Sequence, residues 1–388
     1  MPVKNRFAEM HAEITGWRRH LHAHPELMYD VHETAAFVVE RLREFGVDEI
    51  NEGIGKTGVV ALIKGKTDTQ GRVIGMRADM DALPIEEATG VEYASTVPGK
   101  MHACGHDGHT AMLLGAAKYL AETRNFDGTV ALIFQPAEEG GAGGLAMCQD
   151  GMMDRWNIQE VYGLHNAPGI SVGEFAIRPG ALLASSDEFK ITVTGKGGHA
   201  AEPALAIDTT LVAAQIVVTL QSIVARNVDP LKRVVLTVGT FNTDSAASNV
   251  IAHEVVMEGT LRTLDKEYRA ICEERIKRVA MDTASAFGAV AEVEWTPGYP
   301  VTFNTEAETG FAADAARAVS ANVDDVTDPI MPSEDFAYML EERPGAYIFL
   351  GNGDTQMCHH PEYNFDDEAI PFGSAWFVEL AERRMPLG

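Results

Sequence analysis

The first part of the chain alternates short apolar runs with amphipathic segments. The apolar runs are bounded by glycine or charged residues and occupy residues 58–63, 72–76, 129–134 and 161–165. Such runs are typical of strands that are buried on both faces. Residues 35–45 and 110–120 carry apolar side chains at helical spacing. The pattern predicts an α/β domain whose mostly parallel sheet is covered by helices.

The middle of the chain has a different order of elements. Strand-like runs occupy residues 189–195, 233–241, 253–263 and 289–295. Residues 207–226 and 266–286 have the pattern of helices between them. This β-α-β-β-α-β order is the ferredoxin-like split motif, which forms a domain in its own right.

The alternation of the first part resumes after Pro297. The elements expected there are a helix near 307–320, a strand at 346–351 and a last helix near 366–384. These elements are too few for a third domain, so we expect them to rejoin the first sheet. The sequence therefore predicts one domain in two parts, residues 1–185 and 298–388, with residues 186–297 inserted.

Charge narrows the choice of partners. The 388 residues include 31 Lys and Arg against 57 Asp and Glu, which gives a net charge of −26. A surface of this sign repels phosphate backbones and anionic lipid headgroups, so neither nucleic acid nor a membrane is the expected partner. The 46% hydrophobic and 23% charged residues are those of an ordinary soluble globular protein.

Several patterns indicate a cytoplasmic protein. The four cysteines are widely scattered, and the N-terminus has no apolar signal segment. The longest uncharged stretch, residues 209–225, is short for a membrane span and carries Gln215, Thr219, Gln221 and Ser222. We expect it to be a mostly buried helix.

Candidate chemistry is densest at residues 101–110, which read MHACGHDGHT. Gly105 lets the backbone bend so that Cys104 and His106 can point at one place. Thiolate and imidazole are both good ligands for zinc-like ions. The competing interpretation of this segment is a turn with buried polar residues.

Three further segments follow predicted strands. Glu138 and Glu139 come after the strand at 129–134, His165 ends the strand at 161–165, and CHHP follows the strand at 346–351. Ligand sites in open α/β sheets lie at the carboxyl ends of the strands. If Glu138 and Glu139 lie on extended chain they point in opposite directions, so that one can bind metal while the other addresses a water.

One site could collect these side chains: Cys104, His106, Glu139, His165 and either His359 or His360. One zinc ion takes three or four protein ligands, so the set favours two metal ions.

The sequence resembles the hippurate hydrolase branch of the aminoacylase and carboxypeptidase metallopeptidases. The resemblance covers nearly the whole chain and rests on ordered segments: WRRHLHAHPEL, GMRADMDALPI, MHACGHDGHT, FQPAEEGG, GLHN, GKGGHAAEP, SNVI, GTLRT and a late HP. It implies a di-metal exopeptidase-type catalytic domain with an inserted ferredoxin-like lid and dimerisation domain.

The resemblance also implies roles for individual residues. The metal ligands would be Cys104, His106, Glu139, His165 and His359, where Pro361 sets the register of the late motif. Glu138 would be the general base. In the lid, His199 would help to hold the scissile carbonyl, while Asn249 and Arg262 would bind polar groups of the substrate. A histidine expected soon after Pro203 is replaced by Ala204, Leu205 and Ala206.

The implied reaction is hydrolysis of the amide bond of N-acyl amino acids, hippurate-like or N-acetylated, to a carboxylate and an amino acid. The implied cofactors are two divalent ions per subunit, zinc or manganese, with cobalt or nickel as further options. The implied assembly is a homodimer or a dimer-based homotetramer.

The same residues are compatible with other functions. A dipeptidase or carboxypeptidase would share the fold, and a non-catalytic binding paralogue would have lost the chemistry. A cysteine hydrolase could use Cys104 with His106 or His109, but it gives no reason for Glu138 and Glu139.

Further polar residues near these segments have weaker signals. His20, His22 and His24 recur with the period of a strand face, and a structural role is expected for them. Asp79 and Asp81 could lie near the metals, and Asp107 could orient a ligand. The roles of His102 and His109 remain open at this point.

Overall fold

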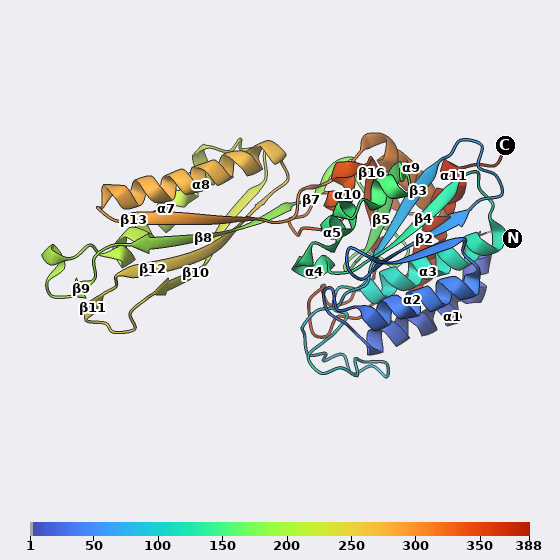
Figure 1. Cartoon of the computed structure of the whole chain (residues 1–388), viewed down its shortest axis with the longest axis horizontal. Helices are drawn as coiled ribbons and strands as arrows, with labels where there is room; N and C mark the ends of the chain where they lie inside the picture. The colour runs from blue at the N-terminus through green and yellow to red at the C-terminus, as the bar shows by residue number, and fades with distance from the viewer. Residues whose placement is uncertain (1–2) are drawn as a thin grey trace. The chain divides into compact units, whose positions relative to one another are not determined.

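The computed structural model describes residues 3–388 as two compact units (Figure 1). The first unit comprises the chain up to Leu182, Phe303–Asp328 and Asp335–Gly388; the second comprises Leu183–Thr302 and Pro329–Glu334. The chain passes from one unit to the other within the short strands β7 (Gly180–Leu183) and β14 (Thr302–Asn304).

The first unit is built on an eight-stranded sheet. In spatial order its strands are β1 (Glu49–Ile54), β2 (Gly58–Lys64), β4 (Thr129–Gln135), β3 (Val73–Asp79), β5 (Glu160–Ala167), β16 (Gly345–Gly351), β6 (Phe175–Ala176) and β15 (Val323–Asp324). The sheet is mixed. β4, β3, β5 and β16 run parallel in its centre, whereas β1, β2 and β6 pair antiparallel. β4 and β16 are buried along their whole length, as strands covered on both faces must be.

Helices cover this sheet. The longer ones are α1 (Val3–Ala23), α2 (His32–Phe45), α3 (His106–Thr123), α9 (Glu306–Val319) and α11 (Ile370–Arg384). The shorter ones are α4 (Glu138–Gly141), α5 (Gly143–Gln149), α6 (Met152–Arg155) and α10 (Ala337–Glu342). α1, α2 and α11 pack against α3, which is buried along most of its length. Trp376, Leu114 and Phe134 belong to the resulting core.

The second unit has the predicted βαββαβ order. It consists of β8 (Ser185–Thr194), α7 (Thr209–Arg226), β10 (Val234–Thr243), β12 (Glu254–Thr263), α8 (Lys266–Ala286) and β13 (Val290–Pro297). The sheet order is β10-β12-β8-β13, and its neighbouring strands are antiparallel. α7 and α8 pack together on this sheet around a separate core that includes Ile191, Ile216 and Ile276.

The spacing of His20 and His22 is that of a strand face, but both residues lie in the helix α1. One expectation about this fold was wrong. α7 is long and apolar enough to cross a membrane by length and composition alone, but only 33% of it is buried. It is therefore not a mostly buried helix. Its Val212, Ile216 and Leu220 face the core, whereas Leu211 and Val218 are exposed.

Candidate metal centre

The central parallel strands of the first unit bring the candidate residues to one edge of the sheet. β3 ends at Asp79, β4 ends three residues before Glu138, and His165 lies near the end of β5. The loop after β16 carries His359. These strands are neighbours and share one direction, so their carboxyl ends meet. Cys104 and His106 reach the same place from the start of α3.

The five candidate ligands lie within reach of common points. Three overlapping groups have all their ligand atoms within 4.8 Å of one another: Cys104 with His106 and His165, Cys104 with Glu139 and His359, and His106 with Glu138 and Glu139. Cys104 Sγ is 3.4 Å from His165 Nε2. His359 Nε2 is 3.3 Å from Glu139 Oε1. Overlapping groups of this kind fit two adjacent ions better than one.

Hydrogen bonds orient two of the imidazoles. His106 Nδ1 donates to the carbonyl oxygen of Asp81 at 2.8 Å, and His165 Nδ1 donates to that of Asn166 at 2.6 Å. Each ring therefore keeps the lone pair of Nε2 available on the side of the other candidate ligands. A backbone acceptor on the second ring nitrogen is the usual arrangement for a metal-binding histidine.

Polar atoms at the centre fit a cation. His106 Nε2 and Glu139 Oε1 are buried and lack a well-formed hydrogen bond among the described residues; Asp79 Oδ2 lies 3.5 Å from the first atom and His359 Nε2 lies 3.3 Å from the second. A thiol hydrogen bond with Cys358, burial and the nearby charge of Glu139 hold the pKa of Cys104 well above its ordinary range. A positive ion at this place would pair with the orphaned atoms and would allow Cys104 to ionise.

Glu138 and Glu139 are held by one carboxylate. Asp81 Oδ1 accepts the backbone N–H of Glu138 at 2.9 Å, and Asp81 Oδ2 accepts that of Glu139 at 3.1 Å. The expected extended chain at the two glutamates was wrong, because they begin the kinked turn α4. Asp81 binds both N–H groups and thus fixes the direction of both side chains.

A second acidic group beside the centre is already neutralised. Asp79 Oδ2 accepts from Arg77 Nη1 at 2.6 Å, and Asp79 Oδ1 accepts from His109 Nδ1 at 2.6 Å. Burial opposes ionisation of Asp79, but Arg77, His106 and His109 outweigh it and hold its pKa well below the usual range. His109 Nε2 accepts the backbone N–H of Asn166 at 3.0 Å. Both ring nitrogens of His109 are thus engaged within the protein, which favours a supporting role.

Behind the centre lies a buried charged cluster. His22 Nδ1 is 2.8 Å from Asp107 Oδ2, and Arg18 Nη1 is 3.4 Å from the same oxygen. Asp107 directly follows His106, so this cluster fixes the first turn of α3. Near this cluster, burial lowers the pKa of His102 to about 3, so the His102 imidazole stays neutral.

His359 and His360 have different surroundings in the structure. His359 lies against Glu139, and its backbone N–H donates to the carbonyl oxygen of Ala103 at 2.8 Å. His360 is exposed, and its Nδ1 accepts the N–H of Glu362 at 3.1 Å within its own turn. The structure thus places His359, and not His360, beside the candidate ligand Glu139.

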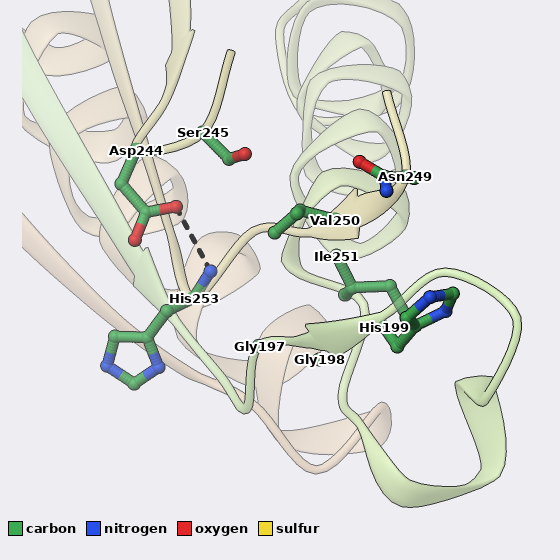
Figure 2. A pocket seen from close by; sticks show the side chains of 9 residues that line it. All are labelled: Gly197, Gly198, His199, Asp244, Ser245, Asn249, Val250, Ile251 and His253. Atoms are coloured by element: carbon green, nitrogen blue, oxygen red, sulfur yellow. Dashed lines mark hydrogen bonds between the residues drawn. The ribbon is translucent and has the colours of Figure 1, made fainter. Parts of the chain in front are cut away.

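Two predicted substrate-binding residues share a pocket in the second unit. His199 in β9 (Gly198–His199) pairs with Val250 in β11 (Val250–Ile251). Figure 2 shows His199 and Asn249 at a pocket of about 550 Å³. His199 Nδ1 accepts the N–H of Ala201 at 3.0 Å, so in the neutral ring Nε2 carries the proton and can donate it to a ligand oxygen.

Arg262 lies elsewhere in the second unit. It stands opposite Ser186 and Val235 near the end of β12, and its Nη1 donates to Ser333 Oγ at 3.0 Å. Burial lowers its pKa against the opposing attraction of Glu188 and Asp187. Asp187 forms its ion pair with Arg269 at 2.6 Å, and no carboxylate of the described residues lies within ion-pair distance of Arg262. The alternative of an exposed arginine paired with a nearby acid is therefore disfavoured.

Sequence analysis did not identify several supporting residues. Asp335 accepts from Arg77 Nη2 at 3.0 Å and from Gln135 Nε2 at 2.7 Å. The Asn166 side chain donates to the Cys104 carbonyl at 2.6 Å and accepts from Tyr363 at 2.6 Å. Asn166 lies near the end of β5 and Asp335 just before α10, and the partners of these residues are up to 258 residues away in the sequence.

Comparisons with known proteins agree with this geometry. The sequence model of Peptidase family M20/M25/M40 matches residues 75–383. N-acetyl-L-cysteine deacetylase of Bacillus subtilis is 45% identical over 96% of this chain and 88% of its own. Hippurate hydrolase of Campylobacter jejuni is 40% identical over 96% of this chain and 97% of its own.

A solved structure is similar over nearly its whole length. It is a dinuclear metal-binding peptidase of the M20 family from Bacillus subtilis, 37% identical, with a TM-score of 0.85 over 97% of this chain and 99% of that one. The sequence match and the fold lead to the same assignment: the chain belongs to the peptidase family M20/M25/M40.

Proposed function

We propose that this protein is a di-metal amidohydrolase that cleaves N-acyl amino acids to a carboxylate and a free amino acid. The observation that carries the proposal is the gathering of five metal-type side chains around Glu138, at the carboxyl edge of the sheet. The relatives named for deacetylation of N-acetylcysteine and for hydrolysis of hippurate suggest the substrate class.

Cys104, His106, Glu139, His165 and His359 would hold the two divalent ions. Zinc or manganese fits these ligands, and cobalt or nickel would also bind them. Bound there, the ions would lower the pKa of a water towards neutrality and polarise the amide carbonyl.

Glu138 would act as the general base. It is 7% exposed, so its carboxylate works in a site with little solvent. It would accept the proton of the attacking water and pass it to the nitrogen of the leaving amine. Its place beside the ligand Glu139 brings base and metal ions together.

Three residues, contributed by the second unit of the same chain or of a partner copy, would complete the site. The Nε2–H of His199 would donate to the oxygen of the tetrahedral intermediate, and Asn249 would bind a polar group of the substrate. Arg262 lacks a carboxylate of its own and would pair with the substrate carboxylate.

The second unit would also be a dimerisation domain. Leu211 and Val218 are 58% and 65% exposed on α7, and Phe241 is 40% exposed on the edge strand β10. A second copy of the chain could cover this apolar surface and continue the sheet. The proposed assembly is a homodimer or a homotetramer built from such dimers. The proposed location is the cytoplasm.

The test is a hydrolysis screen of N-acyl amino acids and dipeptides with added zinc, manganese, cobalt or nickel. We expect release of a free amino acid from acetyl or benzoyl derivatives, abolished by a chelator and insensitive to small alkylating agents when metal is bound. Inactivation by alkylation of the metal-loaded protein, with no effect of chelator, would instead indicate a cysteine hydrolase.

A further inference from the structure

The loop that carries Glu138 has an unfavourable backbone. Ala137 and Ala142 adopt φ values of 53° and 54°, and Gly140 adopts 88°. The left-handed region costs an alanine on the order of 1 kcal/mol relative to a right-handed conformation. Residues 137–142 therefore need contacts from outside the loop to stay in this conformation.

Asp81 supplies such contacts at the start of the loop, and the turn at residues 28–29 supplies others. The Met28 carbonyl oxygen accepts the N–H of Ala137 at 3.0 Å. The Tyr29 hydroxyl donates to the carbonyl oxygen of Gly141 at 2.7 Å. The turn thus forms hydrogen bonds with Ala137, the residue before Glu138, and with Gly141, three positions after Glu138.

Tyr29 is itself firmly placed. Its carbonyl oxygen accepts from Thr57 Oγ1 at 2.9 Å, and the ammonium of Lys56 lies 3.7 Å from the centre of its ring. The side chain is only partly exposed. A hydroxyl on such an anchored ring can fix the Gly141 carbonyl instead of following its movements.

We propose that Tyr29 is a positioning residue for the general base. Its hydroxyl holds the far side of the loop, so that the Glu138 carboxylate stays aimed at the water that it deprotonates. The inference rests on the proposed role of Glu138. Because Tyr29 acts on the base and not on bound substrate, its loss lowers kcat and leaves KM in place.

The test is a double-mutant cycle with Tyr29→Phe and Glu138→Gln. Tyr29→Phe removes one hydroxyl and keeps the ring beneath Lys56. We expect a five- to tenfold lower kcat, the factor for one ordinary hydrogen bond, with KM within twofold and metal content unchanged. In the Glu138→Gln protein, whose slow turnover is followed at high enzyme concentration, Tyr29→Phe should have no further effect.

Tyr162→Phe is the matched control. Its hydroxyl also donates at 2.7 Å, to Glu160 at the amino-terminal end of β5. This variant should lower the melting temperature and keep kcat. An unchanged kcat in Tyr29→Phe, or an equal loss in both backgrounds, would overturn the role of Tyr29. Full activity of Glu138→Gln alone would instead overturn the proposed base.

Discussion

His199 and Arg262 lie at opposite ends of the same four-stranded sheet. His199 follows the end of β8, whereas Arg262 stands opposite Ser186 at the beginning of that strand. Glu254 and Arg262 are eight residue steps apart along β12, which at about 3.3 Å per step is roughly 26 Å. An N-acetyl amino acid is about two extended residues long, or roughly 7 Å. The second unit of one chain therefore cannot place both side chains on one N-acetyl amino acid.

This separation predicts that a dimer shares its sites. We expect His199 to serve the partner's site and Arg262 to serve the site of its own chain. Mixing inactive His199→Ala with inactive Glu138→Gln protomers should then restore roughly a quarter of wild-type activity, since half of the dimers are hybrids and each hybrid has one intact site.

A second mixture provides the control. Arg262→Ala with Glu138→Gln should restore nothing, because each hybrid site keeps one lesion if Arg262 acts in its own chain. Subunit exchange is verified by mass spectrometry of tagged protomers. No recovery in the first mixture despite proven exchange would show that the lid serves its own chain.

Arg262→Ala tests the recognition of the substrate carboxylate. We expect kcat/KM for substrates with a free carboxylate to fall by about 2–4 kcal/mol, the cost of leaving a buried charge unpaired. The corresponding amides should be much less affected. The measurement compares acid and amide forms of one N-acyl amino acid, and equal losses on both would remove Arg262 from this role.

Cys104→Ser should weaken metal retention, because a hydroxyl is a poorer ligand than a thiolate. Peroxide should inactivate the metal-free enzyme faster than the metal-loaded one, since a bound thiolate is protected. Cys358→Ser, a change at the neighbouring thiol, is the control and should retain metal. Elemental analysis decides, and an unchanged metal content in Cys104→Ser would exclude this residue as a ligand.

The His22–Asp107 pair predicts a stability that depends on pH. Burial opposes protonation, but Asp107 and Glu87 outweigh it and Arg18 opposes them only in part, so the pKa of His22 rises from 6.5 to about 9. A raised folded-state pKa gives stability that is complete below pH 6.5 and lost as the pH rises through 9. The loss is about 3 kcal/mol at 1.36 kcal/mol per pKa unit.

Urea unfolding of the metal-loaded protein between pH 6 and 10 measures this effect. The decline should be much smaller in His22→Gln, which cannot be protonated. The same decline in both proteins would assign it to other groups.

The sequence predicted the features that local pattern encodes. The buried runs at 58–63 and 129–134 became β2 and β4, and the βαββαβ order of the second unit could be read from periodicity. His20 and His22 have the spacing of a strand face but lie in the helix α1, so the spacing of three residues does not by itself identify the element.

Contacts between distant residues could not be predicted from local pattern. Asp81 binds the N–H groups of residues 57 and 58 positions later, and Tyr29 binds Gly141 from 112 positions away. The pairing of β3 with β4 brings Asp81 to the two glutamates, and the bridge between Leu27 and Ala82 places the turn of Tyr29 near them. The separation of His199 from Arg262 likewise follows from strand register, which the motifs alone do not contain.

The adjacent residues Glu138 and Glu139 allow the most direct test of the account. Glu138→Gln and Glu139→Gln remove the same charge one position apart, and metal content and kcat are measured for both. Glu138→Gln should keep both metal ions and lose several orders of magnitude in kcat, whereas Glu139→Gln should lose metal. A fully metallated Glu138→Gln enzyme with more than about a tenth of wild-type turnover would contradict the assignment of the base.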